Sequence, residues 1–322
     1  MLSSSHCVAK SALARPGARH ICYCHTPMRY AWDQFDSYFG PDQVGRAASA
    51  VLRPVLARLA RWDAATAGRV DRYMANSHYV AERIRRYYNR GSAVVYPPVD
   101  TAFYRPDPAR SPEPFFLVVS ALVPYKRVDV AIRACGSAGV ALRIVGKGPE
   151  ELRLRRIAET AGVNVEFAGW LAEKQVRALY QGSRAVLMPG IEDFGIVPVE
   201  AQACGRPVVA LAEGGAVESV VDGITGVLVG DRSVEAFATA LRDVSSRPFD
   251  GAAIRRHAES FSKARFQEQF RQVIDTDRNS DTRGTNNDPR EIGAKPPINP
   301  GDRSNAARYR QRRYNPAARE NK

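Results

Sequence analysis

Cysteine is scarce in this sequence, and long apolar runs are absent from it. Its 322 residues hold five cysteines, too few and odd in number for the disulfide framework of a small secreted protein, so we expect buried or reduced thiols, as in a cytoplasmic protein. No run approaches the roughly 18 consecutive apolar residues of a membrane-spanning helix. Apolar residues make up 44% and charged residues 25%, which excludes collagen-like, coiled-coil and wholly disordered chains.

Positive charge is in excess. Lysine and arginine number 47 against 34 aspartates and glutamates, a net charge of +13, which favours phosphates, nucleic acid or an anionic membrane as partners. Residues 276–322 carry +5 of this charge, from 11 basic and 6 acidic residues. They include no Leu, Val, Phe, Met or Trp, so we expect a disordered tail that needs no ligand. Its cluster Arg308–Tyr314 leaves contact with RNA or lipid open as an alternative.

Strand and helix patterns alternate through the middle of the chain. Short apolar runs that fit buried parallel strands are separated by helical patterns of about 10 to 15 residues, as in a parallel sheet with right-handed crossovers. The sequence therefore predicts a complete doubly wound α/β domain. The expected strands are 115–120, 141–146, 163–168, 185–188 and 207–211, and the expected helices are 128–137, 150–161, 172–181 and one from about 197.

The first hundred residues predict fewer elements. We expect strands at 19–25, 72–77 and 93–99 and a helix at 77–88. Two or three strands do not make a stable Rossmann-type core without further partners, so this half is incomplete by its pattern. The final helix is expected over residues 250–274.

A further helix, over 43–62, interleaves arginines with apolar residues. Two interpretations stay open for it. The helix packs its apolar side on the sheet, or its arginine edge meets an anionic membrane.

The most specific motif is Gly190–Ala201, which follows one expected strand and opens a helix. That place is the carboxyl edge of a parallel sheet, where α/β proteins bind ligands, and unpaired amides at the helix start attract phosphate. Glu200 is placed to accept hydrogen bonds from two adjacent ribose hydroxyls, and Glu192 to meet a second polyol. This suits a ligand with a sugar at each end of a pyrophosphate. The alternative is an acidic loop and a glutamate favoured by the helix dipole.

The spacing Glu192-x7-Glu200, with Phe194-Gly195 inside it, resembles the E-x7-E signature of glycosyltransferase family 4, the retaining group 1 glycosyltransferases of GT-B fold. Other segments are similar to the same family: Ser120–Asp129 to its phosphate-binding segment, Val145–Pro149 to its nucleotide loop, and Gly214–Glu218 and Asp222–Gly226 to its late glycine-rich turns. Tyr23–Asp33 and Val95–Asp100 resemble a subgroup of polysaccharide and lipopolysaccharide assembly, often mannosyltransferases. The matches cover about residues 3–275.

The resemblance implies a donor site. Lys126 would bind the diphosphate, with Arg127 beside it, while Glu200 would hold the ribose. Glu192 and the amides that open the helix would hold the donor sugar and the distal phosphate. The implied catalytic residues are His25, Lys126 and Glu192, and the implied donor-binding residues are Lys126, Arg127, Gly146, Lys147, Gly148, Glu192, Phe194, Gly195, Ile196, Val197 and Glu200. Arg29 would meet the acceptor or the diphosphate between the two domains. No metal cofactor is expected.

One position departs from the family pattern. The family often has an arginine five residues before the phosphate-binding lysine, and here that residue is Ala121. One of two expected cations is therefore missing, and Lys147 is the candidate to replace it.

Together these observations predict an α/β protein of GT-B fold with two Rossmann-like domains, the N-terminal one incomplete and apparently truncated. We expect a partial acceptor-side domain over 1–110, a nucleotide-sugar-binding domain over 111–248, a helix over 249–275 that crosses back to the first domain, and the tail over 276–322.

The predicted function is retaining transfer of a hexosyl group, with mannosyl favoured. The donor would be a nucleotide diphosphate sugar, with GDP-mannose favoured, and the acceptor a glycan or lipid-linked glycan. We expect a cytoplasmic protein, with a peripheral position at an anionic membrane surface left open, and no specific nucleic acid partner. Two alternatives stay open: a non-catalytic nucleotide-sugar-binding remnant, and a nucleic-acid or membrane binder acting through the basic tail.

Overall fold

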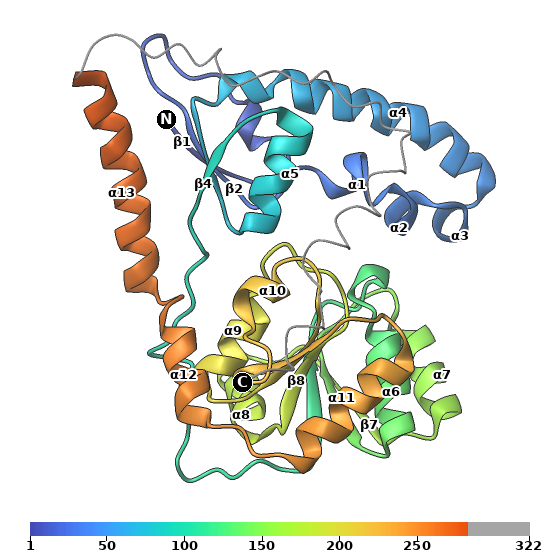
Figure 1. The fold of residues 1–322 in the computed structure, drawn as a ribbon. Coiled ribbons are helices and arrows are strands. Elements are labelled where there is room, and N and C mark those ends of the chain that lie inside the picture. The colour runs from blue at the N-terminus through green and yellow to red at the C-terminus, as the bar shows by residue number, and fades with distance from the viewer. Residues whose placement is uncertain (283–322) are drawn as a thin grey trace, which may run out of the picture. The chain divides into compact units, whose positions relative to one another are not determined.

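Two parallel sheets organise the chain. The structure is a computed structural model and describes residues 1–282. In this part of the chain, ten strands form a four-stranded sheet in the order β1-β2-β3-β4 and a six-stranded sheet in the order β10-β9-β8-β5-β6-β7 (Figure 1). The strands are Leu2–Ser5 (β1), Ile21–Cys24 (β2), Arg72–Ala75 (β3), Ser92–Val94 (β4), Phe115–Val119 (β5), Ala141–Val145 (β6), Val165–Gly169 (β7), Ala185–Met188 (β8), Val208–Leu211 (β9) and Gly226–Val229 (β10).

Helices connect these strands. We call β1 to β4 with their helices the N-terminal half, and β5 to α12 the C-terminal half. The helices of the N-terminal half are Arg29–Trp32 (α1), Phe35–Phe39 (α2), Pro41–Val44 (α3), Arg46–Ala65 (α4) and His78–Tyr88 (α5). Those that follow are Val128–Ala138 (α6), Glu151–Ala161 (α7), Glu173–Gly182 (α8), Ile196–Ala203 (α9), Ala216–Ser219 (α10), Val234–Ser246 (α11), Gly251–Glu259 (α12) and Lys263–Thr282 (α13).

The strand order of the larger sheet reverses in its middle. The chain adds β6 and β7 on one side of β5, then returns to place β8, β9 and β10 on the other side. β5 and β8 are neighbours, with Phe116 opposite Ala185. Ligands of open α/β sheets bind outside the carboxyl ends of the strands at such a reversal. The prediction of an α/β fold with parallel sheets is confirmed.

Alternate residues of β5 enter two different cores. Phe116 and Val118 pack with Ile132 and other side chains of α6 and α11 on one face of the sheet. Phe115 and Leu117 pack on the other face, with Tyr180 of α8 among their neighbours. This is the two-residue alternation of a strand buried on both faces. Full burial of such a side chain stabilises the fold by about 1.5–3 kcal/mol.

A buried ion pair fixes the helices of the N-terminal half. The ammonium of Lys10 lies 3.0 Å from the carboxylate of Asp63, and both side chains are almost completely buried. Asp63 also accepts hydrogen bonds from the Trp32 indole and the Tyr88 hydroxyl, each at 2.8 Å. Because these residues come from the segment after β1 and from α1, α4 and α5, the network ties the end of α1 to α4 and α5, and α1 carries Arg29.

The final helix is interrupted, so the expectation of one helix over 250–274 is wrong. α12 ends at Glu259 and α13 begins at Lys263. Between them the Phe261 carbonyl accepts a hydrogen bond from the Val99 amide at 2.9 Å, and Val99 pairs with Ser262 in a parallel bridge. The backbone of Phe261 and Ser262 therefore pairs with Val99, in the segment that connects the two halves, and the helix is broken there.

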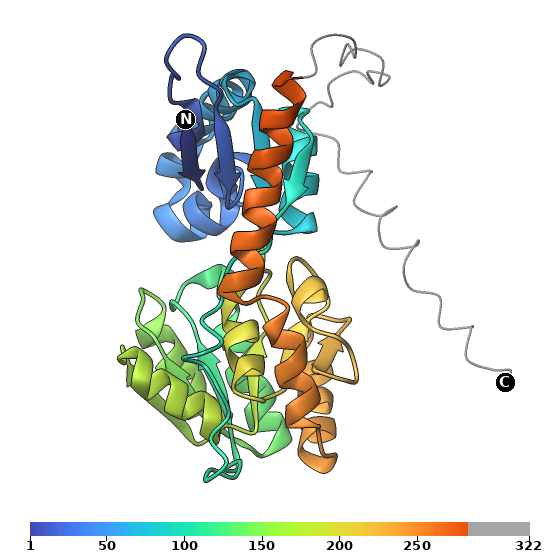
Figure 2. The ribbon, with the colours of Figure 1, turned by 90° about the vertical axis from the view of Figure 1, so that its left-hand side faces the viewer.

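The first turns of α13 pack on the smaller sheet (Figure 2). The rings of Phe266 and Phe270 lie 5.8 and 6.3 Å from that of Tyr23 on β2. α13 runs on to Thr282, beyond the boundary expected at residue 275. Most of the segment expected to be disordered lies outside the described residues. Within residues 1–282, no helix is both long and apolar enough to cross a membrane.

Candidate functional site

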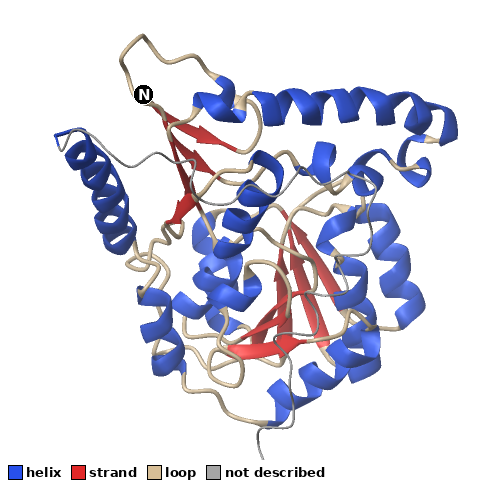
Figure 3. Ribbon diagram, turned by 45° about the horizontal axis from the view of Figure 1, so that its top comes forward, coloured by secondary structure: helices blue, strands red, loops and turns tan. Residues whose placement is uncertain are grey.

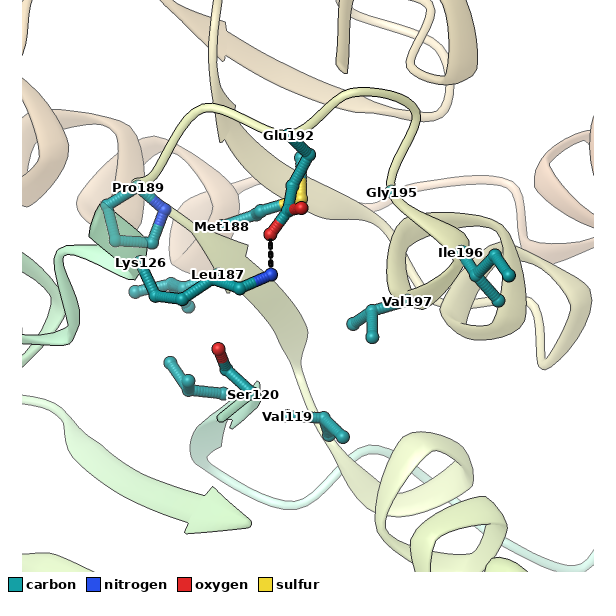
Figure 4. A pocket seen from close by; sticks show the side chains of 11 residues that line it. Val119, Ser120, Lys126, Leu187, Met188, Pro189, Glu192, Gly195, Ile196 and Val197 are labelled. Atoms are coloured by element: carbon teal, nitrogen blue, oxygen red, sulfur yellow. Dashed lines mark hydrogen bonds and ion pairs between the residues drawn. The ribbon is translucent and has the colours of Figure 1, made fainter. Parts of the chain in front are cut away.

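The loops that follow β5 and β8 meet where the strand order reverses, at the carboxyl ends of the strands drawn in red in Figure 3. A pocket of about 100 Å³ opens between them. The sequence predicted five of its lining residues, Lys126, Glu192, Gly195, Ile196 and Val197. The remaining lining residues, which are apolar except for one serine, are Val118, Val119, Ser120, Leu187, Met188 and Pro189 (Figure 4). We call this cavity the donor pocket, after the ligand that the sequence predicts for it.

Lys126 and Glu192 form an ion pair in the donor pocket (Figure 4). Lys126 belongs to the short 3-10 turn after β5, and Glu192 lies in the turn between β8 and α9. The side chains are 20% and 13% exposed, so both heads lie in a partly desolvated setting. The fold thus joins a cation and a carboxylate that stand 66 residues apart.

The turn from Glu192 into α9 leaves backbone donors open. Gly195 is the N-cap of α9, has a φ of 85° and offers no side-chain cap. The first amides of a helix have no partner within it, and Pro198 has no N–H, so the donors at this end are those of Ile196 and Val197. A Cβ on Gly195 would lie 3.3 Å from the Met188 sulfur. Glycine therefore fits both the dihedral angle and the space.

Glu200 lies one turn further along α9, outside the donor pocket lining. One of its carboxylate oxygens accepts a hydrogen bond from the Tyr180 hydroxyl at 2.8 Å. Burial raises the pKa of Glu200 above its ordinary value, and the hydrogen bonds from Tyr180 and Tyr104 oppose this rise. Tyr180 is fully buried. No sequence pattern singles out Tyr180 beyond the helix that contains it.

The glycine-rich loop after β6 supports the loop after β5 without lining the donor pocket. A Cβ on Gly146 would lie 1.8 Å from the Ser120 carbonyl oxygen, and one on Gly148 would lie 2.3 Å from that of Leu122. The Leu122 amide donates to the Lys147 carbonyl at 3.0 Å. The side chain of Lys147 is exposed, and so is Ala121.

Arg127 turns away from the donor pocket. It has a φ of 52°, in the left-handed region, and its guanidinium pairs with Asp129 at 3.1 Å. It lines a second cavity of about 390 Å³, together with Arg232, Tyr125 and several residues of the N-terminal half. Phe194, expected among the donor-binding residues, buries its ring against Tyr96 and Phe261.

His25 directly follows β2 and lines neither of these two cavities. Its Nε2 lies 2.8 Å from the Ser4 hydroxyl, and its ring packs edge-on against Tyr23. Burial lowers the pKa of His25, with a smaller lowering from His6 and an opposing effect of Asp193.

Arg29 reaches the turn that carries Glu192. Its Nε donates to the Asp193 carboxylate at 2.7 Å, and the two groups form an ion pair. Asp193 is 7% exposed. Burial raises its pKa, and Arg29 and Arg83 act against that rise.

Hydrogen bonds that the sequence did not predict connect the two halves here. The Ser77 hydroxyl donates to the Asp193 carbonyl at 2.6 Å. The Glu218 carboxylate accepts from the amides of His78 and Tyr79, which open α5, at 2.8 and 2.9 Å. The turn Gly214–Glu218 stood out in the sequence, but its contact with the other half did not. Within residues 1–282, no group of three or more His, Cys, Asp and Glu side chains is placed to hold a metal ion.

Sequence comparisons match both halves of the chain to glycosyltransferase family models. Residues 100–264 match the family model "Glycosyl transferases group 1", and residues 2–103 match "Glycosyltransferase Family 4". A GDP-mannose-dependent alpha-(1-6)-phosphatidylinositol monomannoside mannosyltransferase of Mycolicibacterium smegmatis is 35% identical over 205 residues, which are 55% of this chain and 54% of the relative. A D-inositol 3-phosphate glycosyltransferase of Rhodococcus opacus is 34% identical over 224 residues, 60% of this chain and 50% of the relative. The chain spans about half the length of the curated relatives it matches.

Solved structures share the fold at low sequence identity. The Anabaena protein HepE in complex with UDP has a TM-score of 0.66 at 20% identity, with 80% of this chain and 72% of that chain covered. The lipopolysaccharide outer core galactosyltransferase WaaB has a TM-score of 0.61 at 18% identity, over 80% of this chain and 68% of that chain. The family match over both halves, on a fold that these structures share, shows that the chain belongs to the group 1 glycosyltransferases of family 4, with the GT-B fold.

Proposed function

We propose that this chain is a retaining hexosyltransferase that moves a sugar from a nucleotide diphosphate sugar to a glycan or lipid-linked glycan acceptor. The observation that supports it most is the meeting of Lys126 and Glu192 at the reversal of strand order, beside the open amides of α9. These groups complement such a donor. The ammonium and the amides suit its phosphates, and the carboxylate suits the hydroxyls of its sugar.

The proposed mechanism places the cation where charge develops. As the bond between C1 of the sugar and the diphosphate breaks, negative charge builds on the diphosphate, so donors at that position stabilise the transition state more than the ground state. Lys126 exchanges its partner Glu192 for a phosphate oxygen. The carboxylate of Glu192 is then free to accept hydrogen bonds from the sugar.

Retention follows if attack comes from the face that the leaving group occupies. The acceptor oxygen forms its bond to C1 on that face while the bond to the diphosphate breaks, and the acceptor proton passes to a diphosphate oxygen. Glu192 then acts as a ligand of the sugar and forms no bond to C1.

We favour GDP-mannose as the donor and mannosyl as the group transferred. The relative from Mycolicibacterium smegmatis is named as GDP-mannose-dependent and as a mannosyltransferase at 35% identity. The structure of HepE contains UDP, at 20% identity. The closer sequence match supports guanine as the base.

We propose that the acceptor lies in the second cavity. This cavity shares Pro189 with the donor pocket, and its walls come from both halves. From the N-terminal half, Gln34 contributes a buried carboxamide oxygen without a hydrogen-bond partner among the described residues, and Ser37 contributes a hydroxyl. An unpaired acceptor such as that of Gln34 suits a hydroxyl of a glycan, because a buried acceptor without a partner costs about 1–3 kcal/mol.

We also propose that α4 meets an anionic membrane surface, where a lipid-linked acceptor would be found. Leu56 and Ala60 are buried, so this side of α4 packs against the fold. Val51, Val55, Arg58 and Trp62 follow one another at helical spacing on the exposed face of α4. An apolar stripe with an arginine in it is typical of interfacial helices.

A non-catalytic nucleotide-sugar-binding protein is the second candidate. The observation that favours it is Ala121, which is exposed after β5 where the family often has a second cation. Under this proposal Lys126 and Glu200 still support nucleotide binding, but transfer does not follow. Restoring the cation with Ala121→Arg would then produce transfer that the natural sequence lacks. The third interpretation, binding through the basic tail, concerns residues that lie mostly outside those described.

Titration calorimetry with GDP, UDP and ADP tests the donor site. We expect GDP to bind most tightly and Lys126→Ala to weaken it about 10- to 100-fold, because a charge-assisted hydrogen bond contributes about 1.5–3 kcal/mol. Lys174→Ala, at an exposed lysine of α8, is the matched control and should bind as the natural sequence does. Equal affinity of the Lys126 variant, or absence of nucleotide binding, would exclude the proposal.

A further inference from the structure

The start of α5 is capped by a residue of the other half. The His78 and Tyr79 amides donate to the Glu218 carboxylate at 2.8 and 2.9 Å. The Val80 amide donates to the hydroxyl of the N-cap residue Ser77 at 3.0 Å. Three of the open amides of the first turn are thus satisfied, two of them by a carboxylate from α10, which also complements the helix dipole.

Glu218 is joined closely to the turn that carries Glu192. α10 begins directly after Gly215, whose amide donates to the Glu192 carbonyl at 2.8 Å. Glu192 and Gly214 form a parallel bridge. A Cβ on Gly215 would lie 2.3 Å from the Phe194 Cα. Backbones this close cannot slide past each other, so a displacement of Glu218 shifts the Glu192 turn as well.

The same turn is held a second time through Asp193. Ser77 donates its hydroxyl to the Asp193 carbonyl at 2.6 Å. Arg29 pairs with the Asp193 carboxylate, which is buried. The N-terminal end of α5 therefore contacts the Glu192 turn directly through Ser77 and indirectly through Glu218. We call Ser77, Asp193 and Glu218 the clasp.

We propose that Glu218 and Ser77 are positioning residues that set the donor affinity by holding the Glu192 turn, although neither lines the donor pocket. The inference rests on the proposed function, because it concerns the same donor site. Coupling between two sites is reciprocal in binding free energy. A nucleotide that binds better when the clasp is formed therefore makes the first turn of α5 more stable.

A purely structural clasp makes a different prediction. If Glu218 and Ser77 only dock the two halves, their loss lowers the melting temperature but leaves the affinity for nucleotide unchanged. Nucleotide would then have no effect on the amides of His78, Tyr79 and Val80. Two readouts separate the possibilities: nucleotide affinity, and the nucleotide dependence of hydrogen exchange at these amides.

The experiment compares Glu218→Gln with Glu213→Gln in the full chain. Glu213 lies in the segment between β9 and α10, and it pairs with Arg232 of the C-terminal half, so its variant is the matched control. We expect GDP affinity, measured by calorimetry, to fall about 5- to 20-fold for Glu218→Gln and to stay within twofold for Glu213→Gln. Glu218→Asp, which keeps the charge, should recover part of the loss. In the natural sequence GDP should slow exchange at the three amides, and in Glu218→Gln it should not.

Ser77→Ala provides a second variant in case Glu218→Gln does not fold. It removes the donor to the Asp193 carbonyl, and we expect about a 3- to 10-fold loss of GDP affinity. If both variants bind GDP as the natural sequence does, the clasp has no role in donor binding and the inference is wrong, while the proposed function stands. If the natural sequence binds none of GDP, UDP and ADP, both the proposed function and the inference fail.

Discussion

Glu200 is a carboxyl group held in a setting that disfavours its charge. Burial raises its pKa, and the Tyr180 hydroxyl, at 2.8 Å, offsets only part of that effect. A raised pKa means that the folded protein keeps the proton to higher pH than the unfolded chain does. The contribution of Glu200 to stability is therefore fully present below the unfolded pKa, and it is lost as the pH rises through the raised pKa.

Glu200→Gln should separate stability from function. Glutamine still accepts the Tyr180 hydrogen bond but carries no charge to desolvate. We expect its melting temperature to exceed that of the natural sequence by about 2–4 °C at pH 8, with the difference shrinking as the pH falls through the raised pKa. Thermal melts between pH 4 and pH 8 measure this, with Glu159→Gln at an exposed position of α7 as the control. A difference that does not change with pH would contradict it. GDP affinity should fall at the same time.

Sequence patterns predicted five of the residues that line the donor pocket, but not the residues that hold them in place. Lys126 and Glu192 were expected in one site, and the structure brings them into contact. Asp193, Ser77 and Glu218 were not expected, because a hydrogen bond between residues 116 or 140 positions apart leaves no local pattern. Asp193 stood inside the recognised motif. Its partner Arg29 was placed between the domains, but the pair itself was not predicted.

At the scale of elements, the loop after β6 has little conformational freedom. Gly146 has a φ of 132°, and an added Cβ would lie 1.8 Å from the Ser120 carbonyl oxygen. A displaced Ser120 would in turn disturb the donor pocket that it lines.

Gly146→Ala should therefore cost about 3 kcal/mol or more of unfolding free energy, since it combines backbone strain with a clash. Gly230→Ala is the matched control, because nothing lies within 4 Å of a Cβ there and its φ is not in the left-handed region. We expect that change to stay within about 1 kcal/mol. Urea unfolding of both variants measures the difference, and similar midpoints would refute this explanation of the loop.

If the exposed face of α4 contacts an anionic membrane, charged substitutions on that face should weaken membrane binding. Val51 and Val55 are 67% and 55% exposed and stand one turn apart. Changing both to aspartate should reduce sedimentation with vesicles rich in anionic lipid at least fivefold, because two apolar anchors are lost and two negative charges are added. Leu152→Asp on α7, where leucine is 72% exposed, is the control. Equal sedimentation of all three proteins would remove α4 from the membrane proposal.

More of the larger sheet than of the smaller one could be predicted from the sequence. The expected strands and helices between 115 and 211 correspond to β5 through β9 and α6 through α9, because strands buried on both faces are continuous apolar runs. β1 was not predicted, since Leu2–Ser5 is mostly serine. β10 and α11 follow a glycine-rich turn that we interpreted only as a turn. The break between α12 and α13 depends on a bridge to Val99, which no pattern near residue 261 indicates.

At the scale of the whole molecule, residues 1–275 form one compact unit. Within it, the chain passes between the N-terminal half and the C-terminal half twice. One crossing follows β4, and the other lies between α12 and α13. Beyond the second crossing, Phe266 packs edge-to-face on Tyr23 with ring centroids 5.8 Å apart. Such a pair contributes about 0.5–1.5 kcal/mol beyond the area it buries.

Phe266→Ala should loosen the N-terminal half selectively. We expect faster hydrogen exchange in β2 and β3, with β5 and β8 unchanged, and a loss of about 1–2 kcal/mol in unfolding free energy. Phe249→Ala, which removes a half-buried ring packed on the core of the larger sheet, is the control and should leave β2 and β3 protected. Faster exchange throughout both sheets in the Phe266 variant would show that the halves do not respond separately.

Because the five cysteines are distributed over both halves, their reaction with a thiol reagent can report the unfolding of each half separately. Cys22 and Cys24 are buried in the N-terminal half and Cys135 and Cys204 in the C-terminal half, while Cys7 is partly accessible. Burial raises the pKa of all four buried thiols, which also slows their alkylation. A pulse of thiol reagent should therefore mark Cys7 in the native protein, and each further pair of adducts, located by mass spectrometry, records the opening of one half.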